Sequence, residues 1–455
     1  MINELIQYFE NNKILILGFG LEGKSTYKLI RKYLPNKKIY ISDKKENLKD
    51  ESELLKNDNN VEVNSGSTYL DNLNNYDVIM KSPGISLKDF ELSNIRANIK
   101  SQLELLLEFF KVYTIGITGT KGKSTTSSLI YKVLKDQGKD VLLLGNIGTP
   151  VFDWIDEIKE NMYLVLEMSS HQLEFMDLSP NISLLLNVYE EHLDHYKSLD
   201  SYIDAKCNIF SHQKKSDYYI YNADINKIID KNIKFKTDST KYAVTLKDNL
   251  VKEDNIVTYK NEKIYINDIE VYDTKNNRKL LGMHNLNNIM FVLAISKILN
   301  LDSQKTIATI NSFEALPHRI EYVGKYNDIT FYNDSIATIP EATINSIEAL
   351  KSVNTLIIGG LDRGVNFDKF INYLDNSNIE NIICLPATGH KIGKQMKNSD
   401  IKKFYVENIE GAVDVAKKCT KKNSICLLSP AAASYGFFKN FEERGNKFKE
   451  LVKKQ

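Results

Sequence analysis

A glycine- and lysine-rich segment at residues 119–125 carries the residue types that bind the phosphates of a nucleotide. Glycines permit a tight turn whose backbone N–H groups point inward, and a helix after the turn adds the positive end of its dipole. Lys123 can then reach the β- and γ-phosphates, and the Ser124 hydroxyl can bind Mg²⁺. Ile117 stands where a Walker loop has a glycine, so the alternative is a solvated strand-to-helix turn. We predict a shortened phosphate-binding loop made of Gly119, Thr120, Lys121, Gly122, Lys123, Ser124 and Thr125.

A carboxylate and a histidine follow two apolar strands in the same region. Glu167 ends the apolar run that begins at Met162, which is where nucleotide-binding sites place a carboxylate for Mg²⁺. His192 follows the next apolar run, at residues 182–188. A lone histidine more often serves packing than metal binding, but the neighbouring strands already end in Lys123 and Glu167. We therefore predict Glu167 and His192 as metal ligands.

Amide and ammonium side chains near two predicted helices extend this set. Asn285 and Asn288 lie three residues apart on one face of a helix start, and their amides suit the edge of a purine. Asparagines also cap helices, so capping is the competing interpretation. Lys206 lies on the amphipathic helix 202–210, where its simplest interpretation is an ordinary solvated lysine. Asn146 lies in a turn between two glycines, after a further apolar strand.

A second glycine-rich turn lies near the N-terminus. An apolar run leads into Gly18-x-Gly20-x-x-Gly23, and Asp43 ends the next apolar strand about 20 residues later. This pattern is typical of Rossmann folds. It favours a dinucleotide such as NAD or another nucleotide diphosphate, with a structural tight turn as the alternative. The turn that contains Gly84 follows a further strand at the carboxyl edge of the sheet, where open α/β sheets bind ligands.

Strands and helices alternate along almost the whole chain, which predicts an α/β protein. A chain of 455 residues is too long for one ordinary core. We predict three domains: a Rossmann-like N-terminal domain at 1–95, a central ATPase-type α/β domain with the phosphate loop at 96–312, and a C-terminal Rossmann-like α/β domain at 313–455. Short alternating runs between residues 230 and 280 predict hairpins at the edge of the central domain.

The composition limits the partners of the chain. Sixty basic residues against 59 acidic ones give a formal net charge of +1, so bulk charge does not favour nucleic acid or an acidic membrane surface. The four cysteines show no metal-type spacing, and no run approaches the ~18 apolar residues of a membrane span. The N-terminus lacks the charged leader and apolar core of a signal peptide. We therefore expect a soluble, cytoplasmic monomer with reduced thiols that binds small molecules.

Taken together, these motifs resemble those of the Mur ligases of peptidoglycan synthesis, and the resemblance covers the whole chain. It is strongest to the members that add D-glutamate to UDP-N-acetylmuramoyl-L-alanine. The related folylpolyglutamate synthetases begin close to their phosphate loop, whereas 118 residues precede Gly119 here. The stretches that carry the resemblance are 119–125, 145–148, 167–174, 187–194, 284–288, 316–319 and 428–445.

The resemblance implies a ligase in which ATP phosphorylates a substrate carboxylate and an amine then attacks the acyl phosphate. This reaction gathers several negative oxygens, so cations must be in place beforehand. By resemblance, Lys123 contacts the ATP phosphates, and Mg²⁺ ions bind at Ser124, Glu167 and His192. Lys206 matches the family's carbamylated lysine, whose anionic group helps to hold the second metal ion.

The resemblance also assigns contacts with the nucleotide and both substrates. The residues that match nucleotide contacts are Asn285, Asn288, Arg319 and Asp334. Those that match contacts with UDP-N-acetylmuramoyl-L-alanine are Gly20, Asp43, Gly84, Asn146 and Ser169. Those that match positions receiving the incoming glutamate are Thr338, Arg363, Ser434 and Phe441.

Two positions depart from the family's pattern. Ile336 stands where the family usually has lysine in Asn-Asp-Ser-Lys-Ala-Thr, and Pro340 follows shortly after. Arg363 stands at a position that is lysine in some members, which keeps the positive charge. Because Ile336 removes a cation from the predicted amino-acid pocket, L-glutamate stays open as the alternative to D-glutamate. An NAD-dependent dehydrogenase fused to an ATP site and a nucleotide-switch ATPase are the alternatives from other classes.

Overall fold

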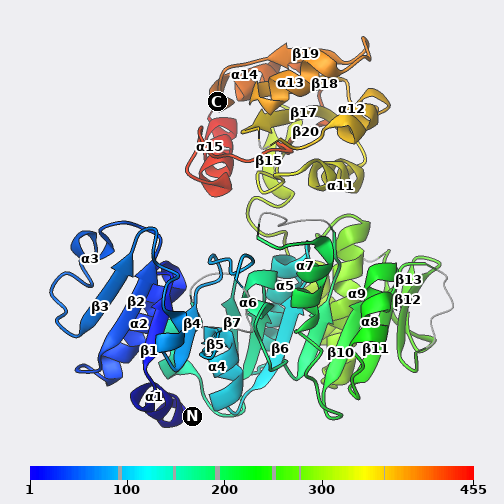
Figure 1. Ribbon diagram of the computed structural model, residues 1–455. Helices are drawn as coiled ribbons and strands as arrows, with labels where there is room; N and C mark the ends of the chain where they lie inside the picture. The colour runs from blue at the N-terminus through cyan, green and yellow to red at the C-terminus, as the bar shows by residue number, and fades with distance from the viewer. Residues whose placement is uncertain are drawn as a thin grey trace. The chain divides into compact units, whose positions relative to one another are not determined.

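The computed structural model has three β-sheets flanked by helices, which confirms the predicted α/β fold class (Figure 1). It describes residues 1–90, 95–146, 150–189, 195–247, 253–275, 278–362 and 364–454. The chain divides into two compact units. Unit 1 comprises Met1–Asn276 and Asn287–Ile310, and unit 2 comprises Asn277–Leu286 and Asn311–Gln455. The domain boundaries near residues 95 and 312 stay predictions.

The first sheet, in unit 1, is parallel and has the strand order β3-β2-β1-β4-β5 among the described residues. Its strands are β1 (Ile14–Leu17), β2 (Ile39–Asp43), β3 (Val61–Ser65), β4 (Val78–Lys81) and β5 (Asn98–Lys100). Every residue of β1 and β4 is buried, as expected for the central strands of a parallel sheet that helices cover on both faces. The helical segments along this part are α1 (Ile2–Asn11), α2 (Leu21–Tyr33), α3 (Leu48–Glu51) and the 3₁₀ turn η1 (Leu73–Asn75).

The second sheet, also in unit 1, has the described strand order β14-β13-β12-β11-β10-β9-β6-β8-β7. Its strands are β6 (Tyr113–Thr118), β7 (Val141–Gly145), β8 (Tyr163–Glu167), β9 (Ile182–Leu185), β10 (Tyr218–Asn222), β11 (Thr240–Thr245), β12 (Ile256–Lys260), β13 (Lys263–Ile266) and β14 (Ile269–Asp273). Neighbouring strands among β6 to β12 pair in parallel. The pairs β12–β13 and β13–β14 are antiparallel, which confirms the predicted hairpins.

The helical segments that precede, connect or follow these strands along the chain fit the alternating pattern. They are α4 (Gln102–Phe109), α5 (Lys123–Asp136), η3 (Val151–Glu157), α6 (Ser170–Leu173), α7 (Leu199–Cys207), α8 (Asn226–Lys234), α9 (Met283–Ile298) and α10 (Ser303–Ser312). One continuous apolar core includes residues from both sheets of unit 1, for example Ile16 of β1 and Leu166 of β8. The first sheet is therefore packed onto the part of the chain that carries the phosphate loop.

The third sheet, in unit 2, has the described strand order β15-β16-β20-β17-β18-β19. Its strands are β15 (Glu321–Tyr326), β16 (Ile329–Asn333), β17 (Val353–Gly360), β18 (Asn381–Ala387), β19 (Lys402–Tyr405) and β20 (Ile425–Leu428). Only β15 pairs antiparallel among these described strands. The helices are α11 (Pro340–Leu350), α12 (Asp368–Asp375), α13 (Thr388–Gln395), α14 (Ile409–Cys419) and α15 (Phe441–Lys453).

Two features bear on the expectations from composition. The cysteines Cys207, Cys384, Cys419 and Cys426 are all free thiols, and all but Cys419 are buried. Within the described ranges, the helices are either too short or too polar to cross a membrane.

Candidate active site

The carboxyl ends of three neighbouring strands of the second sheet lie at one level. Ile117 of β6 and Gly145 of β7 both pair with Glu167 of β8. The phosphate loop therefore begins beside the points where Asn146 follows β7 and Ser169 follows β8. Parallel register thus gathers residues from distant parts of the sequence at one edge of the sheet.

A cavity of about 280 Å³ lies at this edge. The predicted site residues that line it are Gly84, Lys123, Asn146, Ser169 and Lys206. The other lining residues are Pro83, Ser170, His171 and Tyr202. The cavity therefore brings the turn after β4 of the first sheet together with two lysines on helices that flank the second sheet, Lys123 of α5 and Lys206 of α7.

The phosphate loop is fixed by Asn187, which follows β9. The Thr120 N–H donates to the Asn187 carbonyl at 3.0 Å, and the Lys121 N–H donates to Asn187 Oδ1 at 2.8 Å. Asn187 Nδ2 returns a hydrogen bond to the Lys121 carbonyl at 2.9 Å. Gly122 has a φ of +86°, and a Cβ at this position would lie 2.7 Å from Asn288 Oδ1. The loop therefore needs glycine at residue 122, both for its backbone conformation and for space.

Two ammonium groups converge on one carbonyl of this loop. Lys123 Nζ donates to the Gly119 carbonyl at 2.8 Å and to the Thr120 carbonyl at 3.1 Å. Lys206 Nζ donates to the same Gly119 carbonyl at 3.1 Å and lies 4.7 Å from the centroid of the Tyr202 ring. Because Lys206 is only 2% exposed, its interpretation as an ordinary solvated lysine is wrong. Two neighbouring ammonium groups beside a cavity favour an anionic ligand.

Glu167 offers a carboxylate oxygen to a cation beside this cavity. Its side chain is buried, and Oε1 accepts a hydrogen bond from Asn146 Nδ2 at 3.1 Å. Oε2 has no hydrogen-bond partner in the described part of the chain. A buried charged oxygen without a donor is unfavourable unless a cation compensates it, so Glu167 fits a metal ion.

Among the described residues, no further side chains join Glu167 in a cluster of metal ligands. In those ranges no group of three or more His, Cys, Asp or Glu side chains is arranged to hold a metal ion. His192 lies outside the described residues. Mg²⁺ typically binds one or two protein carboxylates and completes its shell with phosphate oxygens and water. Glu167 with the half-buried Ser124 hydroxyl is therefore compatible with Mg²⁺ but does not define a complete site.

Sequence reasoning missed Gln172, which supports Ser169. Ser169 caps α6 in a capping box: its Oγ accepts from the Gln172 N–H at 3.3 Å, and Gln172 Oε1 accepts from the Ser169 N–H at 3.1 Å. Gln172 Nε2 also donates to Glu22 Oε1 at 2.8 Å, which links α6 to α2. The Ser-x-x-Gln spacing at 169–172 is the sequence signal that predicts such a cap.

Asn285 and Asn288, the two asparagines of α9 predicted to bind the nucleotide, are both buried. Asn285, in unit 2, donates from Nδ2 to the Leu281 carbonyl at 2.8 Å, a local contact at the start of the helix. Asn288, in unit 1, lies beside the phosphate loop, where its Oδ1 blocks any side chain at Gly122. Asn288 thus adjoins the predicted nucleotide site. The Asn285 amide donates to a carbonyl and does not accept a backbone N–H as an N-cap does, so this contact does not support the capping interpretation.

The N-terminal glycine turn uses Asp43 to satisfy its own backbone. Asp43 Oδ2 accepts from the Phe19 N–H at 2.6 Å, and Oδ1 accepts from the Lys45 N–H at 2.8 Å. Gly20 and Gly84 are exposed, and no atom lies within 4 Å of the position of a Cβ at either residue. A ligand can therefore approach the backbone at both glycines, whereas the Asp43 carboxylate is already engaged by the turn.

Unit 2 contains a buried carboxylate at the end of β16. Asp334 accepts hydrogen bonds from Ser346 Oγ at 2.6 Å, from Ser429 Oγ at 2.7 Å and from the Ile320 N–H at 3.2 Å. Burial raises the pKa of Asp334 to about 6, against the lowering effect of these bonds and of the Arg319 charge. Asp334 and Arg319, which the resemblance assigns to the same ligand, are thus electrostatically coupled within unit 2.

The residues predicted to receive glutamate are spread over unit 2. Ser434 lines a cavity of about 260 Å³ at the carboxyl ends of β17 and β18. Thr338 is half-buried just before α11, and Phe441 is the half-buried first residue of α15. Neither of them lines this cavity in the described structure. Arg363 lies outside the described residues.

Arg444 is a second residue that sequence reasoning missed. Its side chain is 1% exposed and lines the same cavity of unit 2. Its guanidinium donates to Ser335 Oγ at 3.0 Å, to the Ser335 carbonyl at 2.8 Å and to the Ala432 carbonyl at 3.2 Å. Burial lowers the pKa of Arg444 to about 9, although the Asp334 charge opposes that shift. Arg444 therefore ties the segments that follow β16 and β20, and its place in the matching stretch 428–445 is the signal in the sequence.

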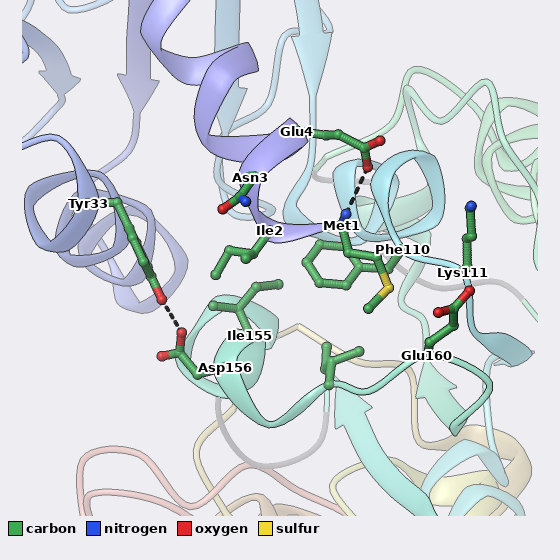
Figure 2. Close-up of a pocket in the computed structure, with 11 residues that line it drawn as sticks. Met1, Ile2, Asn3, Glu4, Tyr33, Phe110, Lys111, Ile155, Asp156 and Glu160 are labelled. Atoms are coloured by element: carbon green, nitrogen blue, oxygen red, sulfur yellow. Dashed lines mark hydrogen bonds and ion pairs between the residues drawn. The ribbon is translucent and has the colours of Figure 1, made fainter.

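A larger hollow of about 470 Å³ in unit 1 contains none of the predicted site residues (Figure 2). Four of its lining residues are paired with one another: the Met1 ammonium lies 2.8 Å from Glu4 Oε2, and the Tyr33 hydroxyl donates to Asp156. Apolar side chains such as Phe110 form much of the rest. This hollow is therefore not a candidate for the reaction.

Three family models match successive parts of the chain. They are the Mur ligase MurD-like N-terminal domain at residues 12–101, the Mur ligase middle domain at residues 117–296 and the Mur ligase glutamate ligase domain at residues 318–432. The 280 Å³ cavity is lined by residues from the first two matched parts.

Related proteins match over almost the whole length. A UDP-N-acetylmuramoylalanine–D-glutamate ligase from Clostridium tetani is 34% identical over 461 residues, which cover 99% of this chain and 98% of that protein. A ligase of the same name from Clostridium perfringens is 32% identical, again over 99% of this chain and 98% of that protein.

Solved structures share the fold at lower identity. MurF ligase from Thermotoga maritima, in complex with ADP, has a TM-score of 0.57 and 17% identity, and the match covers 96% of this chain and 93% of that one. The UDP-N-acetylmuramate–alanine ligase MurC from Thermotoga maritima has a TM-score of 0.57 and 18% identity, with 96% and 98% covered. With the full-length relatives and the three matched family models, these findings show that the chain belongs to the Mur ligase family.

Proposed function

We propose that this chain uses ATP to join D-glutamate to UDP-N-acetylmuramoyl-L-alanine, in the cytoplasmic synthesis of peptidoglycan precursors. The observation that carries the proposal is the 34% identity, over nearly the whole length, to a ligase that bears this reaction in its name. The cavity where Lys123 and Lys206 meet supports it. Lys123 supplies positive charge for a phosphoryl transfer between two anionic substrates, and Lys206 lies beside it, where its carbamate would help to hold a metal ion.

In this proposal the phosphate loop binds ATP. The N-terminus of α5 and the loop N–H groups that do not donate to Asn187 would face the phosphates. Lys123 exchanges its contacts with the Gly119 and Thr120 carbonyls for phosphate oxygens, and it stabilises the charge that develops during transfer. The other nucleotide contacts are assigned to Asn285, Asn288, Arg319 and Asp334.

We infer that Mg²⁺ accompanies the nucleotide. Glu167 would hold it through the oxygen that lacks a donor, with Ser124, His192 and Lys206 as the further assigned ligands. When bound, Mg²⁺ neutralises phosphate oxygens and polarises the phosphoryl group. Carbamylation would convert Lys206 from a cation into an anion, as its proposed metal ligation requires.

The substrate carboxylate is placed at the same cavity in this proposal. Gly20, Asp43 and Gly84 would contact the uridine diphosphate, and the open space beside Gly20 and Gly84 permits a close approach. Asn146 and Ser169 would contact the muramoyl-alanine part, whose carboxylate attacks the γ-phosphorus and displaces ADP. The amine of glutamate then attacks the acyl phosphate and displaces phosphate.

Glutamate is assigned to the carboxyl edge of the third sheet, at Thr338, Arg363, Ser434 and Phe441. Ile336 supports the one close competitor, a preference for L-glutamate, because an apolar residue replaces a cation where a dicarboxylate should bind. Each lost partner of a desolvated carboxylate typically weakens binding by about 1 to 3 kcal/mol. We favour D-glutamate, and we infer a monomer with functional domains at 1–95, 96–312 and 313–455.

The decisive experiment measures phosphate release from ATP with UDP-N-acetylmuramoyl-L-alanine and glutamate, each omitted in turn. Release should require both substrates, and D-glutamate should turn over faster than L-glutamate at equal concentration. A preference for L-glutamate of tenfold or more, about 1.4 kcal/mol, would reverse the stereochemical assignment. An ATP hydrolysis rate that does not depend on either substrate would contradict the ligase and favour a nucleotide-switch ATPase.

A binding measurement distinguishes the remaining class. Calorimetry should detect binding of UDP-N-acetylmuramoyl-L-alanine and no tight binding of NAD. Tight NAD binding without binding of the uridine nucleotide would support the dehydrogenase instead.

The Ile336→Lys variant should increase the preference for D-glutamate over L-glutamate, since it restores the missing cation.

A further inference from the structure

A buried cluster of charges joins the two sheets of unit 1, outside the residues assigned to the reaction. Lys81, the last residue of β4, has a side chain that is 3% exposed. Its Nζ lies 3.5 Å from Glu174 Oε2 and 5.2 Å from the centroid of the Phe175 ring. The same Glu174 oxygen lies 3.0 Å from His195 Nε2. One Glu174 oxygen therefore connects Lys81 of the first sheet with His195, which lies between β9 and α7.

Both ends of this cluster continue into the walls of the 280 Å³ cavity. Lys81 directly precedes the turn that carries Gly84, and Ser86 of this turn donates from Oγ to the His195 carbonyl at 2.9 Å. The His195 ring packs edge-on against the His171 ring, with the centroids 4.2 Å apart. Gly84 and His171 both line the cavity. The cluster is thus the direct support of two of its walls.

Glu174 is also tied to the helix that carries Lys206. Asn208 Nδ2 donates to the carbonyls of Leu173 and Glu174 at 3.0 and 3.3 Å. Asn208 terminates α7, two residues after Lys206. The carboxylate that holds Lys81 is therefore fixed relative to an ammonium group of the cavity.

A second acid faces the same lysine from the first glycine turn. Burial lowers the pKa of Lys81, whereas Glu174 and Glu22 raise it. Burial raises the pKa of Glu22, while the hydrogen bond from Gln172 and the charge of Lys81 lower it. A buried ion pair adds little net stability over apolar packing of the same size, and its best-attested use is to fix one arrangement of segments.

We propose that Lys81 is a positioning residue for the ligation: its ammonium, held by Glu174, fixes the Gly84 turn against the cavity that contains Lys123 and Lys206. The inference rests on the proposed function, which assigns Gly84 to the uridine-diphosphate substrate. Without the ion pair, the turn could shift relative to the two lysines. A displacement of ~1 Å far from the chemistry can lower a rate by about 10²-fold.

The test compares Lys81→Met, which keeps the length of the side chain but removes its charge, with the unmodified protein. The KM for UDP-N-acetylmuramoyl-L-alanine should rise about tenfold or more, and its Kd from calorimetry should rise in parallel. The KM for ATP should stay within about twofold, because the phosphate loop is fixed separately by Asn187. Glu174→Gln should raise the same KM. The double variant should recover part of the loss, since it removes both charges of the Lys81–Glu174 pair and leaves neither of these two without its partner.

Lys38→Met is the matched control. Lys38, just before β2, forms an ion pair at 2.9 Å with Glu62 of β3 in the first sheet, but both side chains are more than half exposed. Exposed pairs contribute little, so this variant should leave both KM values and the melting temperature unchanged.

Three outcomes separate the inference from its rivals. A folded Lys81→Met variant with a lower melting temperature but unchanged KM and Kd for the uridine substrate would overturn the inference and make Lys81 a structural cation. If Lys81→Met does not fold, the isosteric Glu174→Gln variant decides by the same comparison. Failure of the unmodified protein to bind the uridine substrate or ligate glutamate would overturn the proposed function, and the inference with it.

Discussion

The two glycine turns of unit 1 share one local pattern but satisfy their polar groups in opposite ways. Each follows a largely buried strand that pairs in parallel with its neighbours and leads into a helix, from β1 to α2 and from β6 to α5. In the first turn, the Asp43 carboxylate accepts the Phe19 N–H. In the phosphate loop, the ammonium groups of Lys123 and Lys206 both donate to the Gly119 carbonyl.

The difference teaches that the charges brought to a glycine turn decide its ligand, more than the spacing of its glycines. A carboxylate within the first turn already engages one backbone N–H and adds negative charge. A ligand there must rely on the open backbone at Gly20 and on the N-terminus of α2. At the second turn, the Lys123 ammonium and the Mg²⁺ that Glu167 and a carbamylated Lys206 would hold create a positive field that suits a triphosphate.

The largest expected effect comes from removing the lysine of the phosphate loop. Lys123→Ala should lower kcat/KM for ATP by about 10²-fold or more, because one pre-organised charge donor is lost where negative charge develops. Steady-state kinetics with all three substrates measures it. Lys132→Ala is the control, since Lys132 lies on the same helix and forms an ion pair with Asp136 at the surface. Equal activity of both variants would remove the distinction between the two turns.

Lys206→Ala should lower activity about as much as Lys123→Ala. Rescue by added carboxylates tests whether Lys206 acts as a carbamate. If Lys206 acts as a carbamate, added formate or acetate should restore part of the activity of Lys206→Ala, because a small carboxylate can occupy the vacated space. The same additions should not restore Lys123→Ala, which lacks a cation. Full activity of Lys206→Ala without rescue would mean that this buried lysine has no part in the reaction.

The sequence identified most elements that form this site, because apolar runs bounded by polar residues determine buried parallel strands. The expected strand at 39–43 is β2 (Ile39–Asp43), and the run ending in Glu167 is β8 (Tyr163–Glu167). Glycine- and lysine-rich residues after an apolar strand were enough to predict the loop after β6. These features are local, so one segment at a time is sufficient to find them.

The contacts that support the site could not be predicted from the sequence, since they join segments far apart in the chain. Lys81 and Glu174 each have ordinary sequence surroundings, and only the packing of two sheets makes their pair buried. Lys206 lies in an amphipathic pattern that is compatible with a solvated side chain, yet it is buried against Tyr202. The spacing of Asp43 suggested a ligand contact, but the acid's position beside the turn gives it two backbone donors.

Alanine substitutions at two glycines of the first turn should have smaller effects than the lysine variants. They distinguish a glycine needed for packing, Gly23, from one proposed to contact the ligand, Gly20. A Cβ at Gly23 would collide with the Gly18 carbonyl, so Gly23→Ala should lower the free energy of unfolding by about 2 kcal/mol or more. Gly20→Ala should leave stability nearly unchanged, because the space beside Gly20 is open and its φ of −76° suits alanine. Gly20→Ala should nevertheless weaken binding of the uridine substrate severalfold in calorimetry. Unchanged binding in that variant would place the ligand elsewhere.

The smallest expected effect concerns Asp43 and tests whether the acid belongs to the turn or to the ligand. In Asp43→Asn one oxygen still accepts a backbone N–H, whereas the amide group can no longer accept the other. One hydrogen bond is lost, which should lower the free energy of unfolding by about 1 kcal/mol. Both carboxylate oxygens already accept backbone N–H groups, so the contact proposed between Asp43 and the uridine diphosphate should contribute little, and affinity for the uridine substrate should fall only a few-fold. Urea unfolding and calorimetry measure both quantities on one sample. A loss of affinity of 10²-fold with unchanged stability would show that Asp43 binds the ligand directly, and the two glycine turns would then differ less than their hydrogen bonds indicate.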